Sequence, residues 1–259
     1  MNPDKNWKLI LASNRDERYD RETNIMNYYP EEQIIGSRDG NFDGMQIGIS
    51  LNGKIAAVTN LAGIPVNNND KSRGLLVTEF LTKDDFIDYL DYRPYNLLTI
   101  MINKYAIGAS VRRWCDIDIS YINPNQVYGF GNNELDENCY RINKAKESLD
   151  YIIRTSRTKN KLIEGLFEML NSTEKGMSDT SIFMEPKKDT LYGTRTQTII
   201  LIDKNNRITF IERNLLLNSL MRKELFDIFS FKGLSRRRSI ITDYFNQWIE
   251  TEFEFDLKR

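Results

Sequence analysis

The sequence contains no histidine among its 259 residues. Serine or cysteine triads with a histidine base, zinc sites with histidine ligands and a proximal histidine on haem are therefore excluded. Any catalysis has to use carboxylates, Arg or Lys, Tyr, Cys or an N-terminal amine. The absence of this one residue type narrows the chemistry more than any other feature of the composition.

Cysteine and long apolar runs are scarce as well. Cys115 and Cys139 are too few for a disulfide framework and lack CxxC spacing. No apolar run approaches the roughly 20 residues of a membrane-spanning helix, and the start, MNPDKNWK, lacks the pattern of a secretory signal. The formal net charge of −1 offers no field that would attract nucleic acid. We therefore expect a cytoplasmic protein with no transmembrane segment, no metal ligands and no nucleic-acid partner, in an oligomeric state that the sequence leaves open.

What the sequence does contain is a series of short apolar runs that predict strands. Two hairpins are clear, one at 47–58 where Asn52 and Gly53 separate two apolar runs, and one at 196–213. Further strands are expected at 8–13, 33–36, 97–103, 104–111, 117–122 and 126–130, and helices at 72–81, 83–92, 137–156 and 159–170. Mostly antiparallel strands with helices in two groups indicate an α+β fold, and we expect a single domain over residues 1–259.

Two segments near the C-terminus have unusual patterns. Residues 214–240 combine an apolar run with three consecutive arginines at 236–238, and we predict an inserted helix and loop there. The arginines are typical of a solvated patch, with a nucleic-acid contact as the less favoured alternative. Residues 248–257 alternate apolar and acidic side chains, which is the pattern of an edge strand with one solvent-facing side.

Polar residues follow several of the expected strands. The run LILAS leads into Asn14, Arg15, Asp16 and Glu17, and we expect residues 14–32 to be a loop. Either the strand simply ends in solvent, or a site lies at its end. Three more residues occupy similar positions next to strands, namely Asn60, Asn132 and Arg195.

If these strands share one sheet system, Arg15, Asp16, Asn60, Asn132 and Arg195 could converge at one end of it. Together they supply two guanidiniums, a carboxylate and two amides. Arginine forks suit a carboxylate, a phosphate or an oxyanion, and asparagine amides donate to an oxyanion. The alternative is ordinary, because Asn and Gly are common in turns and Arg–Asp ion pairs are frequent. We predict a ligand-binding site made of Asn14, Arg15, Asp16, Glu17, Asn60, Asn132 and Arg195.

Several of the same stretches carry a family resemblance. The sequences SNRDE, DGMQIGISLNGKIAAVTN, SRGLLVTEFL, YGFGN and YGTRTQTIILID, with RITFIER and the C-terminal WIETEFEF, resemble the NRDE family, also called the transport and Golgi organisation protein 2 family. The resemblance covers most of the chain apart from residues 214–240. It implies an N-terminal-nucleophile hydrolase-like fold, a four-layer αββα sandwich of two antiparallel sheets.

The resemblance also implies roles for particular residues. In bile-salt-hydrolase-like relatives of that fold, an N-terminal Cys attacks an amide beside an Arg and an Asp, which Arg15 and Asp16 would match. Asn132 would match the oxyanion residue and Arg195 the second Arg. Family members typically begin Met-Cys before an apolar strand, whereas this chain begins MNPDKNWKLI. We therefore expect the first strand and its nucleophile to be missing from this chain, and enzymatic activity to be absent.

The family is implicated in haem movement, in Golgi and secretory organisation and in acyl-CoA and lipid handling. The resemblance thus favours a non-catalytic carrier of an amphipathic acid, with haem or acyl-CoA as cargo and no resident cofactor. One alternative is an N-terminal-nucleophile amidohydrolase whose Cys is absent from this chain. The other is a partner protein of secretory traffic with a vestigial pocket. A mitochondrial or Golgi-associated pool would fit beside the cytoplasmic one.

Overall fold

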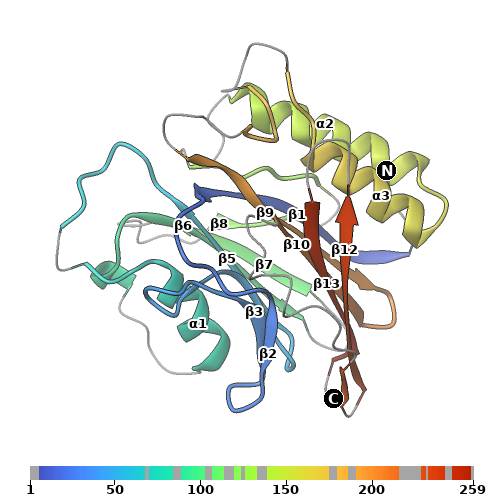
Figure 1. Ribbon diagram of the computed structural model, residues 1–259, viewed down its shortest axis with the longest axis horizontal. Coiled ribbons are helices and arrows are strands. Elements are labelled where there is room, and N and C mark those ends of the chain that lie inside the picture. The colour runs from blue at the N-terminus through green and yellow to red at the C-terminus, as the bar shows by residue number, and fades with distance from the viewer. Residues whose placement is uncertain are drawn as a thin grey trace. The chain divides into compact units, whose positions relative to one another are not determined.

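The computed structural model describes twelve stretches of the chain. These are residues 6–67, 70–83, 89–102, 107–113, 120–123, 126–132, 139–174, 180–185, 191–215, 229–231, 233–242 and 247–257. The chain forms two compact units, Met1–Arg21 with Cys139–Leu257, and Glu22–Asn138 with Lys258–Arg259. Each unit is built on one antiparallel sheet with helices beside it (Figure 1), which confirms the α+β class and the two antiparallel sheets. The single domain and the four-layer stacking of the sheets stay predictions.

The sheet of the first unit has the strand order β1-β9-β10-β13-β12-β11. Its elements are β1 (Trp7–Arg18), α2 (Tyr140–Thr155), α3 (Lys159–Leu170), β9 (Tyr192–Asp203), β10 (Arg207–Leu215), β11 (Phe229–Phe231), β12 (Leu234–Thr242) and β13 (Gln247–Asp256). The two predicted helices at 137–156 and 159–170 and the 196–213 hairpin are confirmed. In Figure 1, α2 and α3 lie side by side next to β1 and β9.

Helix α3 packs on one face of this sheet through its apolar stripe. Leu162, Leu166 and Leu170 form a core cluster with Ile199 and Leu201 of β9. Thr158 caps the helix, because its hydroxyl accepts a hydrogen bond from the backbone N–H of Lys161 at 3.2 Å. The cluster fixes β1 and β9 against the helices, and this positions the site described below.

The opposite face of the same sheet changes from apolar to polar along the strands. Residues that stand opposite each other in neighbouring strands lie on one face. One such row is Leu11, Ile200, Phe210 and Phe253; the row next to it is Ser13, Thr198, Glu212 and Thr251. The second row is almost fully buried from Thr198 onward.

The sheet of the second unit runs in the order of the chain from β2 to β8. Its elements are β2 (Asn27–Tyr29), β3 (Ile34–Arg38), β4 (Met45–Ser50), β5 (Lys54–Asn60), α1 (Gly74–Thr82), a 3-10 turn (Tyr89–Asp91), β6 (Tyr95–Ile102), β7 (Ile107–Arg113) and β8 (Ser120–Tyr121). Helix α1 packs on this sheet through Leu76, Val77 and Leu81. The predicted hairpin at Asn52-Gly53 is confirmed, and Gly53 adopts a φ of 95° that favours glycine.

Three sequence predictions for the part of the chain before residue 139 differ from the structure. Residues 14–18 belong to β1 rather than to a loop, because β9 pairs with them and satisfies their backbone groups. The stretch 126–130 forms no strand, and its neighbour Gly131 bonds instead to side chains of Thr59 and Asn96. The predicted helix at 83–92 falls largely on residues 84–88, outside the described residues, and ends in the 3-10 turn.

The two C-terminal predictions also change. Strand β13 lies between β10 and β12, so it is an interior strand rather than an edge strand. Its acidic side chains face arginines of the neighbouring strands, Arg213 and Arg237, at 2.9 and 2.8 Å. Within 214–240, residues 214–215, 229–231 and 234–240 belong to the strands β10, β11 and β12. Most of the helix expected there falls on residues 216–228, outside the described part.

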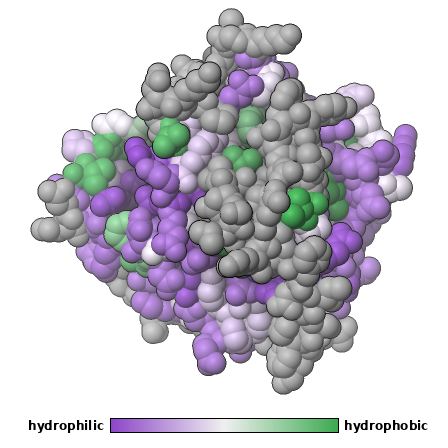
Figure 2. All heavy atoms as spheres, viewed as in Figure 1, coloured by the Kyte–Doolittle hydropathy of each residue, from purple (hydrophilic) through white to green (hydrophobic). Residues whose placement is uncertain are grey.

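The surface of the described residues is mainly hydrophilic on the face shown in Figure 2, with hydrophobic side chains in small separate groups. Exposed large apolar residues include Leu90, Met101, Tyr121 and Tyr151. Among the helices of the described residues, none is both long and apolar enough to cross a membrane.

Candidate functional site at the end of strand β1

The polar end of β1 presents alternate residues to opposite faces of the sheet. Successive side chains of a strand point to opposite sides. Asn14 and Asp16 therefore lie on the helix-covered face, where Asn14 bonds to the carbonyls of Leu170 and Ile182, both at 2.9 Å. Arg15 and Glu17 lie on the other face. A register shift in the pairing with β9 falls between Arg15 and Asp16.

Asp16 is held by two side chains on the helix face. The Thr194 hydroxyl donates to its Oδ1 at 2.6 Å, and Nη1 of Arg141 in α2 lies 3.5 Å from its Oδ2. Burial raises the pKa of this carboxyl above its ordinary value, although the Thr194 hydrogen bond and the Arg141 charge act in the opposite direction. Asp16 is therefore a partly buried carboxyl group whose pKa lies above its ordinary value.

Two phenols lie near enough to Asp16 for its charge to affect their pKa. The Tyr192 hydroxyl donates to the backbone carbonyl of Asp16 at 3.1 Å, and the Tyr19 hydroxyl donates to the carbonyl of Thr194 at 3.3 Å. Burial, together with the charge of Asp16, raises the pKa of Tyr19 to about 12. Both phenols are neutral donors at physiological pH, and they fix the backbone of β1 and β9 at this point.

On the opposite face, Arg15 and Arg21 share one carboxylate. Oε2 of Glu17 lies 3.7 Å from Nη2 of Arg15 and 3.7 Å from Nε of Arg21. All three side chains are partly buried, with 16% of Arg15, 22% of Glu17 and 30% of Arg21 exposed. The trio holds two positive charges and one negative charge, which is a composition that attracts anions.

Arg195 is buried against the chain that follows β1. It is 5% exposed, and its Nη1 donates to the backbone carbonyls of Arg18, at 3.1 Å, and Arg21. These contacts tie β9 to the turn at 18–21. The pairing of β1 with β9 thus places Arg195 next to the strand segment that carries Arg15, Asp16 and Glu17. Its guanidinium nevertheless donates to backbone carbonyls.

Asn60 and Asn132, the two remaining predicted residues, lie in the second unit, and both are exposed. Asn60 accepts a hydrogen bond from Arg73 through its Oδ1. The backbone carbonyl of Asn132 accepts from the N–H of Ala62 at 2.8 Å, so the segment before Asn132 lies beside the end of β5. The convergence of these two asparagines with the β1 residues stays a prediction.

The structure adds residues that the sequence prediction missed. Arg21 and Arg141 carry no motif of their own, and Thr194 was treated only as part of YGTRT. A buried chain of hydrogen bonds also runs from Thr196 to Asn214 at 3.0 Å and from Asn214 to Glu212 at 2.7 Å. The available signal was the position of Glu212 two residues after Phe210, on the face of the strand that buries its side chains.

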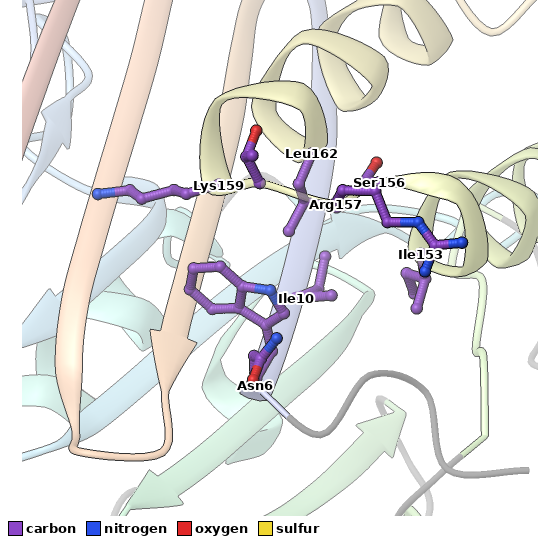
Figure 3. Close-up of a pocket in the computed structure, with 9 residues that line it drawn as sticks. Asn6, Ile10, Ile153, Ser156, Arg157, Lys159 and Leu162 are labelled. Atoms are coloured by element: carbon purple, nitrogen blue, oxygen red, sulfur yellow. The ribbon is translucent and has the colours of Figure 1, made fainter.

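A small cavity lies at the other end of β1, between that strand and the turn joining α2 to α3 (Figure 3). Its walls include Trp7, Ile10 and Leu162. In Figure 3 the Lys159 side chain extends away from Ile10, and its ammonium group pairs with Glu254. The cavity volume is about 60 Å³, whereas ligand pockets usually measure about 300–1,000 Å³. It is too small for an amphipathic ligand.

In the described part of the chain, no three His, Cys, Asp or Glu side chains gather closely enough to hold a metal ion. Cys139, the free cysteine of this part, precedes α2. Cys115 lies outside the described residues.

Comparison with known proteins identifies relatives over most of the chain. The model of the family "Transport and Golgi organisation 2" matches residues 1–216. The human "Transport and Golgi organization protein 2 homolog" is 30% identical over 85% of this chain and 89% of its own length. The Drosophila melanogaster "Transport and Golgi organization protein 2" is 24% identical over 81% of this chain and 87% of its own length.

A solved structure of a Caenorhabditis elegans N-acylethanolamine-hydrolyzing acid amidase ortholog was also found. It matches 74% of this chain and 91% of its own chain, at 15% identity and a TM-score of 0.43.

Proposed function

Because the chain belongs to the Transport and Golgi organisation 2 family, we propose that it is a non-catalytic carrier of an amphipathic acid, haem or a long-chain acyl-CoA, that serves Golgi and secretory organisation. The anionic group of the cargo is held by Arg15 and Arg21 beside Glu17. The observation that carries this proposal is the pair of guanidiniums 3.7 Å from one carboxylate oxygen.

The geometry of the trio suits reversible binding. The 3.7 Å separations exceed the 2.7–2.9 Å of a charge-assisted hydrogen bond. Glu17 keeps the two guanidiniums near each other and offsets one of their charges. A carboxylate or phosphate can then bind to the Arg forks, while the remaining negative charge of Glu17 limits the affinity. Moderate affinity fits a protein that has to release its cargo.

Haem propionates and CoA phosphates share the anionic chemistry, so the experiment compares them directly. The purified chain is titrated with haemin, followed by absorbance, and with palmitoyl-CoA, followed by calorimetry. The same titrations are made with Arg15→Gln and Arg21→Gln, and with Arg18→Gln as the control. Arg18 lies in the same turn, but its side chain is 58% exposed and pairs with Asp20.

We expect saturable binding of one ligand that weakens roughly tenfold or more in Arg15→Gln and Arg21→Gln, since a hydrogen bond to a charged group contributes about 1.5–3 kcal/mol. Arg18→Gln should bind like the wild type. If the folded wild type binds neither ligand, the carrier function is contradicted. The alternative of a partner protein in secretory traffic with a vestigial pocket would then be favoured.

The second candidate function is an N-terminal-nucleophile amidohydrolase whose N-terminal Cys is absent from this chain. One observation favours it, because a partly buried carboxyl group with a raised pKa, such as Asp16, is typical of catalytic sites. Hydrolysis of an N-acyl amide by a form of the protein that carries an N-terminal Cys, abolished by Asp16→Asn, would support this candidate. An N-acyl amide that stays intact over hours with that Cys-bearing form would count against it.

A further inference from the structure

The turn that follows β1 carries Arg21, one of the two arginines assigned to the anion. The N–H of Arg21 donates to the carbonyl of Arg18 at 3.2 Å, which closes the turn, and the N–H of Tyr19 donates to the carbonyl of Leu191 at 2.7 Å. The side chain of Arg18 points to Asp20 through two hydrogen bonds of 2.9 and 2.6 Å. Arg21 is the last residue of the first unit before the chain enters the second.

Arg195 contacts both ends of this turn. One nitrogen of its guanidinium, Nη1, donates to the carbonyl of Arg18 and to the carbonyl of Arg21. The side chain is 5% exposed, so each of these hydrogen bonds forms away from bulk water. A buried guanidinium that lost these acceptors would be costly, and the contacts therefore hold the turn in one conformation.

The backbone position of Arg21 decides where its side chain reaches. Nε of Arg21 lies 3.7 Å from Oε2 of Glu17, and the same oxygen is 3.7 Å from Arg15. If the backbone at Arg21 moved, the Arg21 guanidinium would leave Glu17. The two guanidiniums of Arg15 and Arg21 would then no longer lie beside the same carboxylate oxygen. A misplacement of about 1 Å is enough to weaken a site built from oriented charges.

We propose that Arg195 is a positioning residue for the anion site, which acts by clamping the carbonyls of Arg18 and Arg21 and so places Arg21 beside Glu17 and Arg15. This assignment rests on the proposed function. It differs from the role that the family resemblance implies, in which Arg195 is itself a member of the site. The two roles predict different couplings between Arg195 and Arg21.

The test is a double-mutant cycle on palmitoyl-CoA and haemin binding, with Arg195→Met, Arg21→Gln and the double variant. Methionine keeps an unbranched side chain and removes every donor. If Arg195 acts through Arg21, each single change weakens binding roughly tenfold and the double variant binds no more weakly than either single variant. If Arg195 touches the anion, the two losses multiply, and that result would overturn the proposal.

A second readout reports on the clamp without any ligand. Trypsin cleaves at the carbonyls of arginine residues, and the carbonyls of Arg18 and Arg21 are the two that Arg195 holds. In native digestion followed by mass spectrometry, Arg195→Met should be cleaved after Arg18 and Arg21 at least several-fold faster than the wild type. Cleavage after Arg213, in the interior of the sheet, should stay slow and shows that the fold is intact.

The outcomes separate the inference from the proposed function. If the wild type binds neither ligand, the proposed function fails and the positioning role fails with it. If the wild type binds and Arg21→Gln weakens binding, while Arg195→Met is folded and binds normally, only the positioning role fails. Arg195→Lys retains the charge and donors on a single nitrogen, and we expect it to restore part of the affinity and of the resistance to trypsin.

Discussion

Asn14 binds two backbone carbonyls that belong to other parts of the first unit. Its amide nitrogen donates to Leu170, the last residue of α3, and to Ile182, both at 2.9 Å. The structure therefore shows a side chain that joins β1 to the end of α3 and to the segment 180–185. We regard this as a structural role, beside which the predicted contact with a ligand is untested.

Replacing Asn14 with Ala should lower the free energy of unfolding by about 2–4 kcal/mol, because two hydrogen bonds are lost and two buried carbonyls lose their donor. Urea unfolding followed by circular dichroism measures the change. Asn160→Ala is the control, since Asn160 is exposed on α3 and should change stability by less than about 1 kcal/mol. Equal stability of Asn14→Ala and the wild type would show that the two hydrogen bonds of Asn14 are dispensable for stability.

Asp16 predicts a pH dependence with a definite sign. Burial raises the pKa of its carboxyl in the folded state above that of the unfolded chain. The folded protein therefore binds the proton more tightly, so the contribution of Asp16 to stability is fully present below the unfolded pKa and is lost as the pH rises through the folded pKa. Asp16→Asn keeps an oxygen for Thr194 but does not titrate.

Urea unfolding of both proteins at several pH values between 4 and 7 tests this prediction. The stability of Asp16→Asn relative to the wild type should increase as the pH rises through the lower part of that range. A constant difference would mean that the pKa of Asp16 is the same in both states. A decrease would mean that Arg141 and Thr194 outweigh burial.

Single residues also show why only part of the site was predictable. The polar residues at 14–17 were identified because they follow an apolar run, and the structure places all four near one end of β1. Their separation onto two faces was missed because the stretch was expected to be a loop. A strand assignment would have predicted the alternation, but the pairing with β9 that makes the stretch a strand is a long-range contact.

At the level of elements, β13 shows how neighbouring strands change the meaning of a pattern. The alternating acidic residues indicated a solvent-facing side, yet β10 and β12 place arginines opposite them. The hairpins at 47–58 and 196–213 were predictable, since a local turn signal separates two apolar runs. The order of strands within a sheet depends on partners far along the chain, and one sequence does not specify them.

Two arginine–glutamate pairs of β13 allow a matched comparison between elements. Arg213 binds Glu250 at 2.9 Å and lies 3.5 Å above the ring of Phe167 in α3, and its side chain is 15% exposed. Arg237 binds Glu252 at 2.8 Å, but its side chain is 69% exposed. The geometry of the two ion pairs is nearly equal, whereas their burial differs.

Arg213→Ala should therefore lower the free energy of unfolding by about 2–4 kcal/mol, because a buried pair and a cation–π contact between α3 and the sheet are lost. Arg237→Ala should cost about 1 kcal/mol or less, as expected of an exposed pair. Chemical unfolding of both variants measures the difference. Similar losses in the two variants would show that burial does not set the strength of these pairs.

For the whole molecule, the absence of histidine leaves lysine and arginine as the cationic side chains. Of these two, arginine is the one that presents its donors to an anion in a fixed fork geometry. A ligand that binds the folded state stabilises it by mass action. At a free concentration of 100 times its Kd, the cargo should raise the free energy of unfolding by about 2.7 kcal/mol. Thermal unfolding with and without palmitoyl-CoA measures this shift, and an unchanged midpoint at saturating ligand would contradict a bound complex.

The most direct test of the carrier is the Kd for palmitoyl-CoA or haemin, whichever the wild type binds, in the double variant Arg15→Gln/Arg21→Gln compared with Arg18→Gln. The first variant loses two positive charges beside Glu17, whereas the second loses one positive charge beside Asp20. The account predicts that affinity falls by roughly a hundredfold in the first, about 1.4 kcal/mol for each arginine, and stays at the wild-type value in the second. Equal affinities would show that the end of β1 does not hold the anion.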